Sequence, residues 1–179
     1  RTGLKKELKW QGFGTLTADT LIHPTADLPP VYRALAERGL ADKAKVFCGH
    51  TINDPESPQS LLGRCFDLAH IACEYDLFNR RFEKLWRSTR RKKLFDPESA
   101  FTARTLLIHD YRRILLHDPD LPEELLPVHW PGTRARKRCA AIYHALQEAA
   151  DRWTVSVCCD EPNLLKPPGK DYRQRFSNN

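Results

Sequence analysis

Two groups of cations in the C-terminal half of the sequence have the side chains and the spacing to bind an anion. They are an adjacent pair and a cluster at the start of an expected helix: Arg112 with Arg113, and Arg134, Arg136, Lys137 and Arg138. Positive charge in the first turn of a helix opposes the helix dipole, at a cost of about a few tenths of a kcal/mol per charge. The cluster therefore indicates a nearby anion, either an acidic segment of this chain or the phosphate of a ligand.

The segment between these two groups, residues 117–132, reads HDPDLPEELLPVHWPG and is acidic, stiff and aromatic. Its carboxylates could form a general acid–base pair, or the segment could be a rigid brace between two helices. Asp118 and Asp120 alternate in a loop fixed by prolines, which is typical of turns and caps. Trp130 can bury its ring while its indole N–H finds a carbonyl. We interpret this segment, called the connector below, as a brace and as the first candidate for the anion beside the cluster.

Other residues with catalytic or metal-binding side chains lack the spacing that such sites require. The six cysteines form no CxxC pair and no short disulfide framework, which favours free thiols in a reducing, cytoplasmic location. Zinc is the alternative, but no two candidate ligands have finger-like spacing. His109 and Asp110 are about 100° apart on a helix and so form no catalytic couple; we expect His109 to be a structural histidine at a helix interface. We therefore predict no catalytic residue, no metal and no cofactor.

The composition is that of a globular protein with an anionic partner. Of the 179 residues, 41% are hydrophobic and 29% are charged, and the formal net charge is +6. The excess of cations favours nucleic acid or a phosphorylated ligand as partner. No apolar run reaches the length of a membrane span. The chain starts at Arg1 and contains no methionine, so we expect it to be part of a longer protein.

Residues 1–53 read as an incomplete ferredoxin-like domain. Apolar spacing and glycines predict a helix over 2–10, two very short strands within 15–23 and a helix over 29–38. An apolar run over 45–52 predicts a further strand. The order helix, strand, strand, helix, strand matches a βαββαβ unit that lacks its first strand. We therefore expect an α+β fold whose sheet is completed by a missing N-terminal segment.

Residues 61–179 read as a small helical bundle with an irregular tail, joined to the first domain by a linker over residues 54–60 that contains prolines. Helical periodicity predicts three long amphipathic helices, over 61–86, 96–116 and 133–153. Three such helices form a small bundle. Because the arginine pair follows a tyrosine on the second helix, we expect one of the two to lie near the buried stripe with a carboxylate partner.

Residues 106–132, LLIHDYRRILLHDPDLPEELLPVHWPG, are very similar to the C-terminal half of the PaaX family of bacterial transcriptional repressors of phenylacetate catabolism. Residues 4–16, LKKELKWQGFGTL, resemble the helix and glycine turn that open the central domain of that family. Residues 167–176, PPGKDYRQRF, resemble its closing segment. The resemblance therefore extends over nearly the whole chain.

The resemblance implies a repressor with three parts: an N-terminal winged helix-turn-helix, a central ferredoxin-like domain and a C-terminal helical domain. Proteins of this family are expected to form homodimers on palindromic operators and to release the DNA when phenylacetyl-CoA binds. The winged helix is absent from this chain, so the chain resembles the part that senses the effector and dimerises. The resemblance leaves open whether the effector is phenylacetyl-CoA or another aryl-CoA.

With an aryl-CoA as the implied effector, the two groups of cations gain a candidate ligand. We predict that the phosphates of the effector contact five arginines: Arg112, Arg113, Arg134, Arg136 and Arg138. The acidic connector remains the alternative anion. Two other classes of function stay open, an enzyme or binding module acting on acyl-CoA thioesters and a direct nucleic-acid binder. We find no nucleophile motif for the first, and no helix-turn-helix or aromatic RNA motif for the second.

Overall fold

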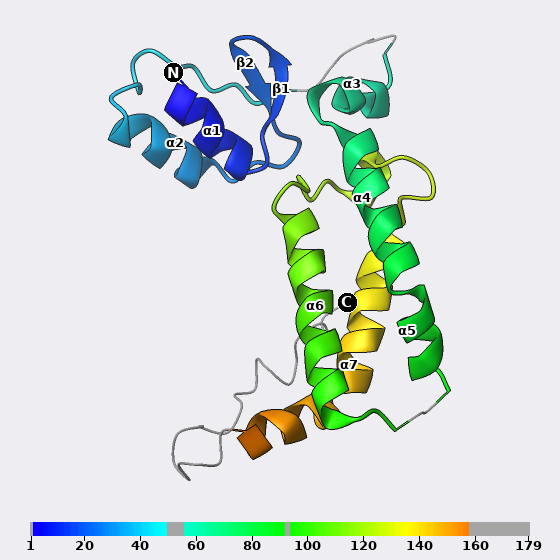
Figure 1. Cartoon of the computed structure of the whole chain (residues 1–179). Coiled ribbons are helices and arrows are strands. Elements are labelled where there is room, and N and C mark those ends of the chain that lie inside the picture. The colour runs from blue at the N-terminus through cyan, green and yellow to red at the C-terminus, as the bar shows by residue number, and fades with distance from the viewer. Residues whose placement is uncertain (1, 50–55, 92–93, 158–179) are drawn as a thin grey trace. The chain divides into compact units, whose positions relative to one another are not determined.

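The structure, a computed structural model, describes residues 2–49, 56–91 and 94–157 (Figure 1). These residues are mostly helical, and the sheet that they contain has two antiparallel strands. The fold is therefore mixed, as the sequence predicts, with helices dominating. The chain divides into two compact units, called the first and the second unit below: Arg1–Glu74 with Arg113–Trp130, and Tyr75–Arg112 with Pro131–Asn179. The predicted linker over residues 54–60 lies partly outside the described residues, and that domain division stays a prediction.

The N-terminal elements of the first unit follow the sequence-based expectation. A helix, a two-stranded hairpin and a second helix succeed one another: α1 (Thr2–Trp10), β1 (Gly14–Thr17), β2 (Thr20–Ile22) and α2 (Leu28–Glu37). Glycines with positive φ follow both helices, 86° at Gly12 and 61° at Gly39, because glycine adopts this conformation without strain. Leu8 of α1 and Val31 and Leu35 of α2 form a small buried core.

The segment that follows α2 corrects one expectation. A strand is expected over residues 45–52, but residues 45–49 form no strand, and residues 50–52 lie outside the described part of the chain. Val46 packs against the core formed by α1 and α2, whereas Phe47 is 87% exposed. An apolar side chain thus anchors a segment that forms no strand, and the residue pattern alone does not distinguish this from a strand. The ferredoxin-like arrangement is not confirmed.

The long helix expected over residues 61–86 is broken. Three shorter helices replace it: α3 (Pro58–Cys65), α4 (Leu68–Arg81) and α5 (Glu83–Thr89). Phe66 is extended (φ −126°, ψ 141°), and the carboxylate of Asp67 accepts a hydrogen bond from the backbone N–H of His70 (3.1 Å). The backbone also departs from helical geometry at Phe82 (φ −94°, ψ 5°), which separates α4 from α5. The periodicity of apolar residues could not reveal these breaks, because the apolar stripe continues through them. Asp67 was the one signal in the sequence, because aspartate is a residue type that caps the start of a helix.

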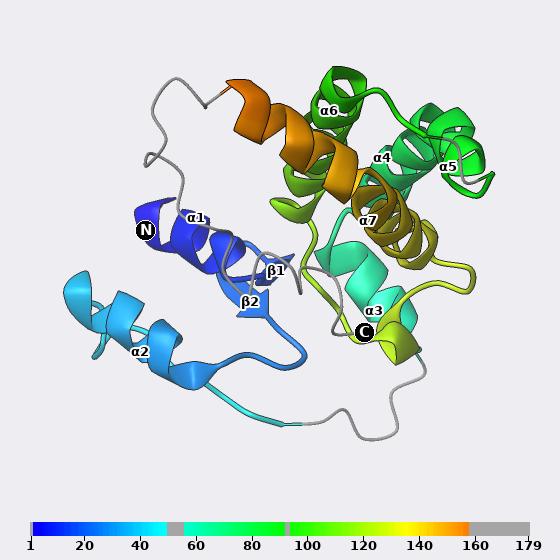
Figure 2. The same cartoon turned by 90° about the horizontal axis from the view of Figure 1, so that it is seen from below.

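The two remaining predicted helices are α6 (Pro97–Leu115) and α7 (Pro131–Val157). The carboxylate of Asp96 caps α6 by accepting a hydrogen bond from the backbone N–H of Ser99 (2.9 Å), which lowers the pKa of Asp96 below its ordinary value. One continuous face of α7 is buried. Helix α5 packs against α7, as both views show (Figures 1 and 2). The second unit is thus a small bundle of helices.

The connector has the local geometry expected of a turn and brace. The carboxylate of Asp118 accepts a hydrogen bond from the backbone N–H of Asp120 (3.0 Å), and Asp120 itself has a φ of 50°. Glu123–Leu125 form one turn of 3₁₀ helix, here labelled η1. The side chain of Trp130 is buried, as expected. The prediction that these acids serve turns is therefore confirmed for Asp118.

The connector also packs onto elements that are distant in the sequence. The side chain of Gln59 on α3 donates a hydrogen bond from Nε2 to the backbone carbonyl of Glu124 (3.0 Å). The carbonyl of Pro119 lies close to the turn after α1, where a Cβ added to Gly12 would be 3.5 Å from it. The same Cβ would lie 2.9 Å from Nε2 of His23, so this turn has no room for a side chain. The connector thus braces the first unit.

Within the described residues, no helix is long and apolar enough to cross a membrane. In the same residues, no group of three or more His, Cys, Asp and Glu side chains could hold a metal ion. The described cysteines are free thiols: Cys48, Cys65, Cys73 and Cys139. Burial raises the pKa of Cys139 to about 12, so this thiol packs as a small hydrophobic group. The other two cysteines, at positions 158 and 159, lie outside the described residues.

Candidate functional site

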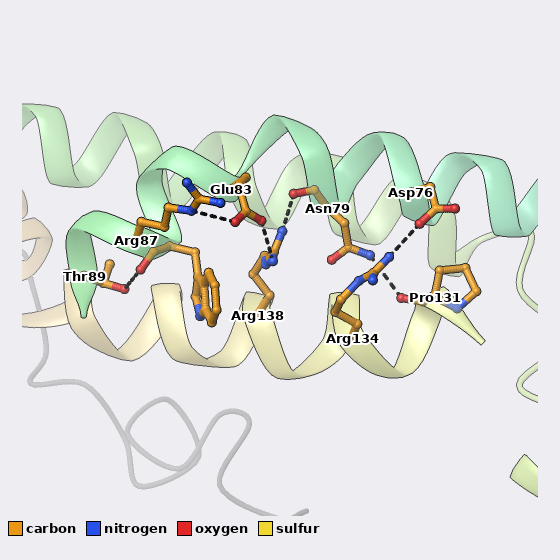
Figure 3. Close-up of polar contacts among 9 residues, drawn as sticks. Asp76, Asn79, Glu83, Arg87, Thr89, Pro131, Arg134 and Arg138 are labelled. Carbon is orange, nitrogen blue, oxygen red and sulfur yellow. Dashed lines mark hydrogen bonds and ion pairs between the residues drawn. The ribbon is translucent and has the colours of Figure 1, made fainter. Parts of the chain in front are cut away.

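Arg138, one of the five arginines predicted to bind the effector, is buried in the second unit (Figure 3). Its side chain is 8% exposed, and its Nη2 lies 2.6 Å from a carboxylate oxygen of Glu83. Its Nη1 donates a hydrogen bond to the backbone carbonyl of Asn79, and its guanidinium lies over the ring of Trp86, 4.6 Å from the centroid. The charge of Arg138 is therefore compensated by contacts with α4 and α5.

Helical spacing brings these partners together. Asn79, Glu83 and Trp86 follow one another at intervals of four and three residues, so they share the side of α4 and α5 that meets α7. The spacing persists through the irregularity at Phe82, whose N–H donates to the carbonyl of Phe78 (3.1 Å) and whose carbonyl accepts from Trp86 N–H (2.9 Å). Glu83 also lies in the first turn of α5, where a negative charge is favourable.

Glu83 binds two arginines. Besides its contact with Arg138, it accepts a hydrogen bond from Nε of Arg87, one turn further along α5 (2.8 Å). Burial alone would raise the pKa of Glu83, but the hydrogen bond from Arg87 and the charges of both arginines outweigh it, and the pKa lies below its ordinary value. One carboxylate between two guanidinium groups leaves an excess of positive charge at this place.

Asn79 ties α4 to the first residue of α7. Its side chain is 3% exposed, and its Nδ2 donates a hydrogen bond to the backbone carbonyl of Pro131 (3.1 Å). The other polar atom of this side chain, Oδ1, is buried and has no hydrogen-bond partner among the described residues, and the same holds for Nε of Arg138. The sequence signal for this network is a polar residue inside the apolar stripe of α4, which the sequence-based interpretation missed.

Arg134 pairs with α4 at the surface. Its Nη2 lies 2.8 Å from Oδ1 of Asp76, and the two side chains are 61% and 47% exposed. This pair and the one between Arg138 and Glu83 correct the expectation that the connector supplies the anion for the cluster. The partners are acids of α4 and α5, because the first turns of α7 pack against those helices while the connector folds onto the first unit.

Arg136 lies on a different flank of α7. Residues two apart on an α-helix are separated by about 200° around the axis, so Arg136 points away from the flank that Arg134 and Arg138 share. Its side chain is exposed and makes no ion pair with a described residue. The structure therefore does not bring the three arginines of the cluster to one place.

The pair Arg112 and Arg113 also differs from the expectation. Both side chains are exposed, and neither forms an ion pair with a described residue, so the prediction that one lies near the buried stripe is wrong. Tyr111 occupies the buried position, and the two arginines that follow it are turned about 100° and 200° away. The nearby carboxylate of Asp110 pairs instead with Arg81 of α4 (2.6 Å).

A carboxylate between two histidines in the first unit was not foreseen. The two oxygens of Glu74 lie 4.0 Å from Nε2 of His70 and 4.0 Å from Nδ1 of His117, distances too long for hydrogen bonds. The spacing of His70 and Glu74 on one helix was visible in the sequence, but the approach of His117 depends on the tertiary fold. His109, expected at a helix interface, is exposed.

Comparison with known proteins places these residues in a family. Residues 66–156, which include all five arginines, match the PaaX-like protein C-terminal domain. Over 184 aligned residues the chain is 36% identical to the transcriptional repressor PaaX of Escherichia coli strain K12. The alignment covers 97% of this chain and 56% of that repressor, so the chain spans about half the length of the curated relative that it matches. With a family-specific domain over half of its residues, the chain belongs to the PaaX family.

Proposed function

We propose that this chain is the effector-sensing and dimerising part of a bacterial transcriptional repressor of phenylacetic acid degradation genes. The observation that carries the proposal is the 36% identity to the transcriptional repressor PaaX over 97% of the chain. In this proposal the protein acts in the cytoplasm as a homodimer, and a winged helix-turn-helix outside this chain reads the operator. The chain is then part of a regulator and not an enzyme.

Phenylacetyl-CoA, or a related aryl-CoA, is the effector that we propose, and its binding releases the operator. An acyl-CoA carries several phosphate charges and an apolar acyl group, so it needs fixed cations beside an apolar pocket. Three of the five arginines are exposed and make no ion pair with a described residue: Arg112, Arg113 and Arg136. These three are the best suited to phosphate. Arg134 would have to exchange Asp76 for the ligand, and Arg138 already has Glu83 as its counter-ion.

Isothermal titration calorimetry of the chain with phenylacetyl-CoA tests the proposal, with CoA and phenylacetate titrated separately as controls. We expect phenylacetyl-CoA to bind more tightly than either control, with the thioester intact afterwards. An assay for free CoA on the same samples separates a sensor from an enzyme, because a thioesterase would release the thiol with time. Absence of binding, or steady release of free CoA, would overturn the proposal.

Alanine variants test the arginines. We expect the double variant Arg134→Ala with Arg136→Ala to bind phenylacetyl-CoA more weakly, because each lost charge-assisted contact costs about 1.5–3 kcal/mol. The two single variants then show which flank of α7 meets the ligand. Lysine replacements should be milder but not neutral, since lysine cannot form the bidentate fork. Unchanged calorimetric affinity in the double variant would remove the cluster from the site and leave Arg112 and Arg113 to be tested.

A further inference from the structure

We propose that α5 and the adjoining parts of α4 and α7 form a second DNA-contacting surface, which binds the phosphate backbone of duplex DNA without reading its sequence. This surface, called the basic face below, consists of six cations: Arg80, Lys84, Arg87, Arg91, Arg134 and Lys137. The inference rests on the proposed function, which makes DNA a partner of the whole protein. It assigns to the helical unit a contact in addition to the one made by the winged helix.

Four of the cations form a row along one side of α4 and α5. Arg80, Lys84 and Arg87 follow one another at intervals of four and three residues, which is the spacing of a single helix face. Arg91 follows four residues later in the turn that ends α5, and all four side chains are exposed. Backbone hydrogen bonds on both sides of Phe82 preserve the helical spacing between the first two. At 1.5 Å per residue, the row is about 16 Å long.

The row runs beside the first turns of α7. Two acids contact arginines of α7: Asp76 of α4 and Glu83 of α5. Arg80 lies four residues after Asp76 and three residues before Glu83, which is the spacing of one helix face. Arg80 therefore lies at the edge that faces α7. On α7, Lys137 follows Arg134 by three residues, so the two side chains are about 60° apart around the helix. Figure 3 shows Arg134 directed toward Asp76 of α4. The six cations thus border one face of the second unit.

The acids near the basic face are already engaged and do not neutralise it. Residues 76–91 contain two acids, Asp76 and Glu83. The first pairs with Arg134, and the second is shared between Arg87 and a buried arginine. The four other cations of the face make no ion pair with a described residue: Arg80, Lys84, Arg91 and Lys137. The face therefore keeps a net positive charge that attracts an anion.

The shape of this charge fits a repeating polyanion. One strand of duplex DNA carries a phosphate for about every 3.4 Å of helix axis, so a row about 16 Å long spans about five phosphates of one strand. A compact phosphorylated ligand would instead use a few convergent groups in a concave pocket. Flexible arginine and lysine side chains contact phosphates without sequence information, so this surface would orient the protein on DNA rather than select the operator.

Fluorescence anisotropy of the chain with a labelled duplex of about 20 base pairs and arbitrary sequence tests the inference, at salt concentrations from about 25 to 200 mM. The variant Arg80→Gln/Lys84→Gln/Arg91→Gln removes three cations of the basic face. The matched control, Lys9→Gln/Arg33→Gln/Lys43→Gln, removes the same charge from exposed positions of the first unit. Circular dichroism and thermal melting verify that both variants are folded.

We expect the unaltered chain to bind the duplex with a steep salt dependence. When log K is plotted against log salt concentration, the slope for the basic-face variant should be shallower by about one unit for each cation removed. The slope for the control variant should change much less. Equal losses in the two variants, no binding at the lowest salt, or equal competition by polyglutamate at the same charge concentration would each overturn the inference. Phenylacetyl-CoA titrated into the same samples keeps the two proposals separate, because the basic-face variant leaves Arg112, Arg113 and Arg136 intact.

Discussion

At the scale of single residues, two arginines on α7 show how much position changes the role of one side chain. Arg138 is buried against Glu83, Asn79 and Trp86, whereas Arg136 is exposed two positions earlier. A guanidinium in the interior must be compensated by charge and hydrogen bonds, since burial removes its hydration. Arg138 therefore contributes to stability, and Arg136 is available to a ligand.

The stability of variants separates these roles. We expect Arg138→Ala to lower the free energy of unfolding by about 2–4 kcal/mol, because it leaves the Asn79 carbonyl unpaired and removes the packing of a buried side chain. Arg136→Ala is the matched control and should change the free energy by about 0.5 kcal/mol or less. Urea denaturation followed by circular dichroism measures both. Equal effects in the two variants would contradict the structural role of Arg138.

His23 gives the stability of the first unit a pH dependence. Its Nδ1 accepts a hydrogen bond from the backbone N–H of Thr25 (3.0 Å), its ring lies 5.1 Å from that of Phe13, and burial lowers its pKa below the ordinary 6.5. The unfolded chain therefore takes up a proton more readily than the folded chain. The contribution of His23 is complete above about pH 6.5 and is lost as the pH falls toward the lower folded-state pKa.

We expect His23→Gln to reduce the fall in melting temperature between pH 7 and pH 5, because glutamine does not titrate in this range. His109→Gln, which replaces one histidine at an exposed position, serves as the matched control. Melting curves over this pH range measure the effect. A melting temperature that falls equally with pH in the His23 variant and in the unaltered chain would show that another group is responsible.

At the scale of elements, the connector illustrates how a stiff segment acts through distant contacts. Its prolines end α6, Asp118 forms a local turn, and its backbone accepts a hydrogen bond from Gln59 of α3. The local part of this behaviour follows from residue types, since proline fixes φ and aspartate binds backbone N–H groups nearby. The contact with α3 joins residues that are 65 apart in the sequence.

Trp130 tests whether the connector is a brace. We expect Trp130→Ala to lower the free energy of unfolding by about 3–5 kcal/mol, because the ring is buried. Glu123→Gln is the control, and its exposed side chain should matter little. Thermal melting gives the comparison. If Trp130→Ala kept the melting temperature but abolished the response to phenylacetyl-CoA, the connector would instead be a binding loop.

At the scale of the whole molecule, the proposed division of labour predicts how the chain treats DNA. The sequence contains no recognisable helix-turn-helix, and specific recognition needs base-edge contacts from such an element. We therefore expect this chain alone to show no preference for operator DNA over a scrambled duplex, whatever its affinity for the phosphate backbone. Electrophoretic mobility shifts with both duplexes measure this. A sequence-selective shift that persists at high salt would contradict it.

The sequence by itself determined those features that depend on neighbouring residues. The hairpin between Gly14 and Ile22 and the glycine turns at Gly12 and Gly39 were predicted. Each of these depends on backbone freedom or on a hydrogen bond within a few residues, so the residue types suffice. The breaks around α4 were not predicted, because the periodicity of apolar residues reports which side is buried and not whether the helix is continuous.

The tertiary structure alone decided which charges meet. Arg134 pairs with Asp76 of α4, 58 residues away in the sequence, and Arg138 pairs with Glu83 of α5. Neither pairs with the connector, which lies next to them in the sequence. The tertiary structure also decided that residues 45–49 form no strand. The physical reason is that ion pairs and strand pairing require two segments to be adjacent in space, and that adjacency follows from the packing of buried faces over the whole unit.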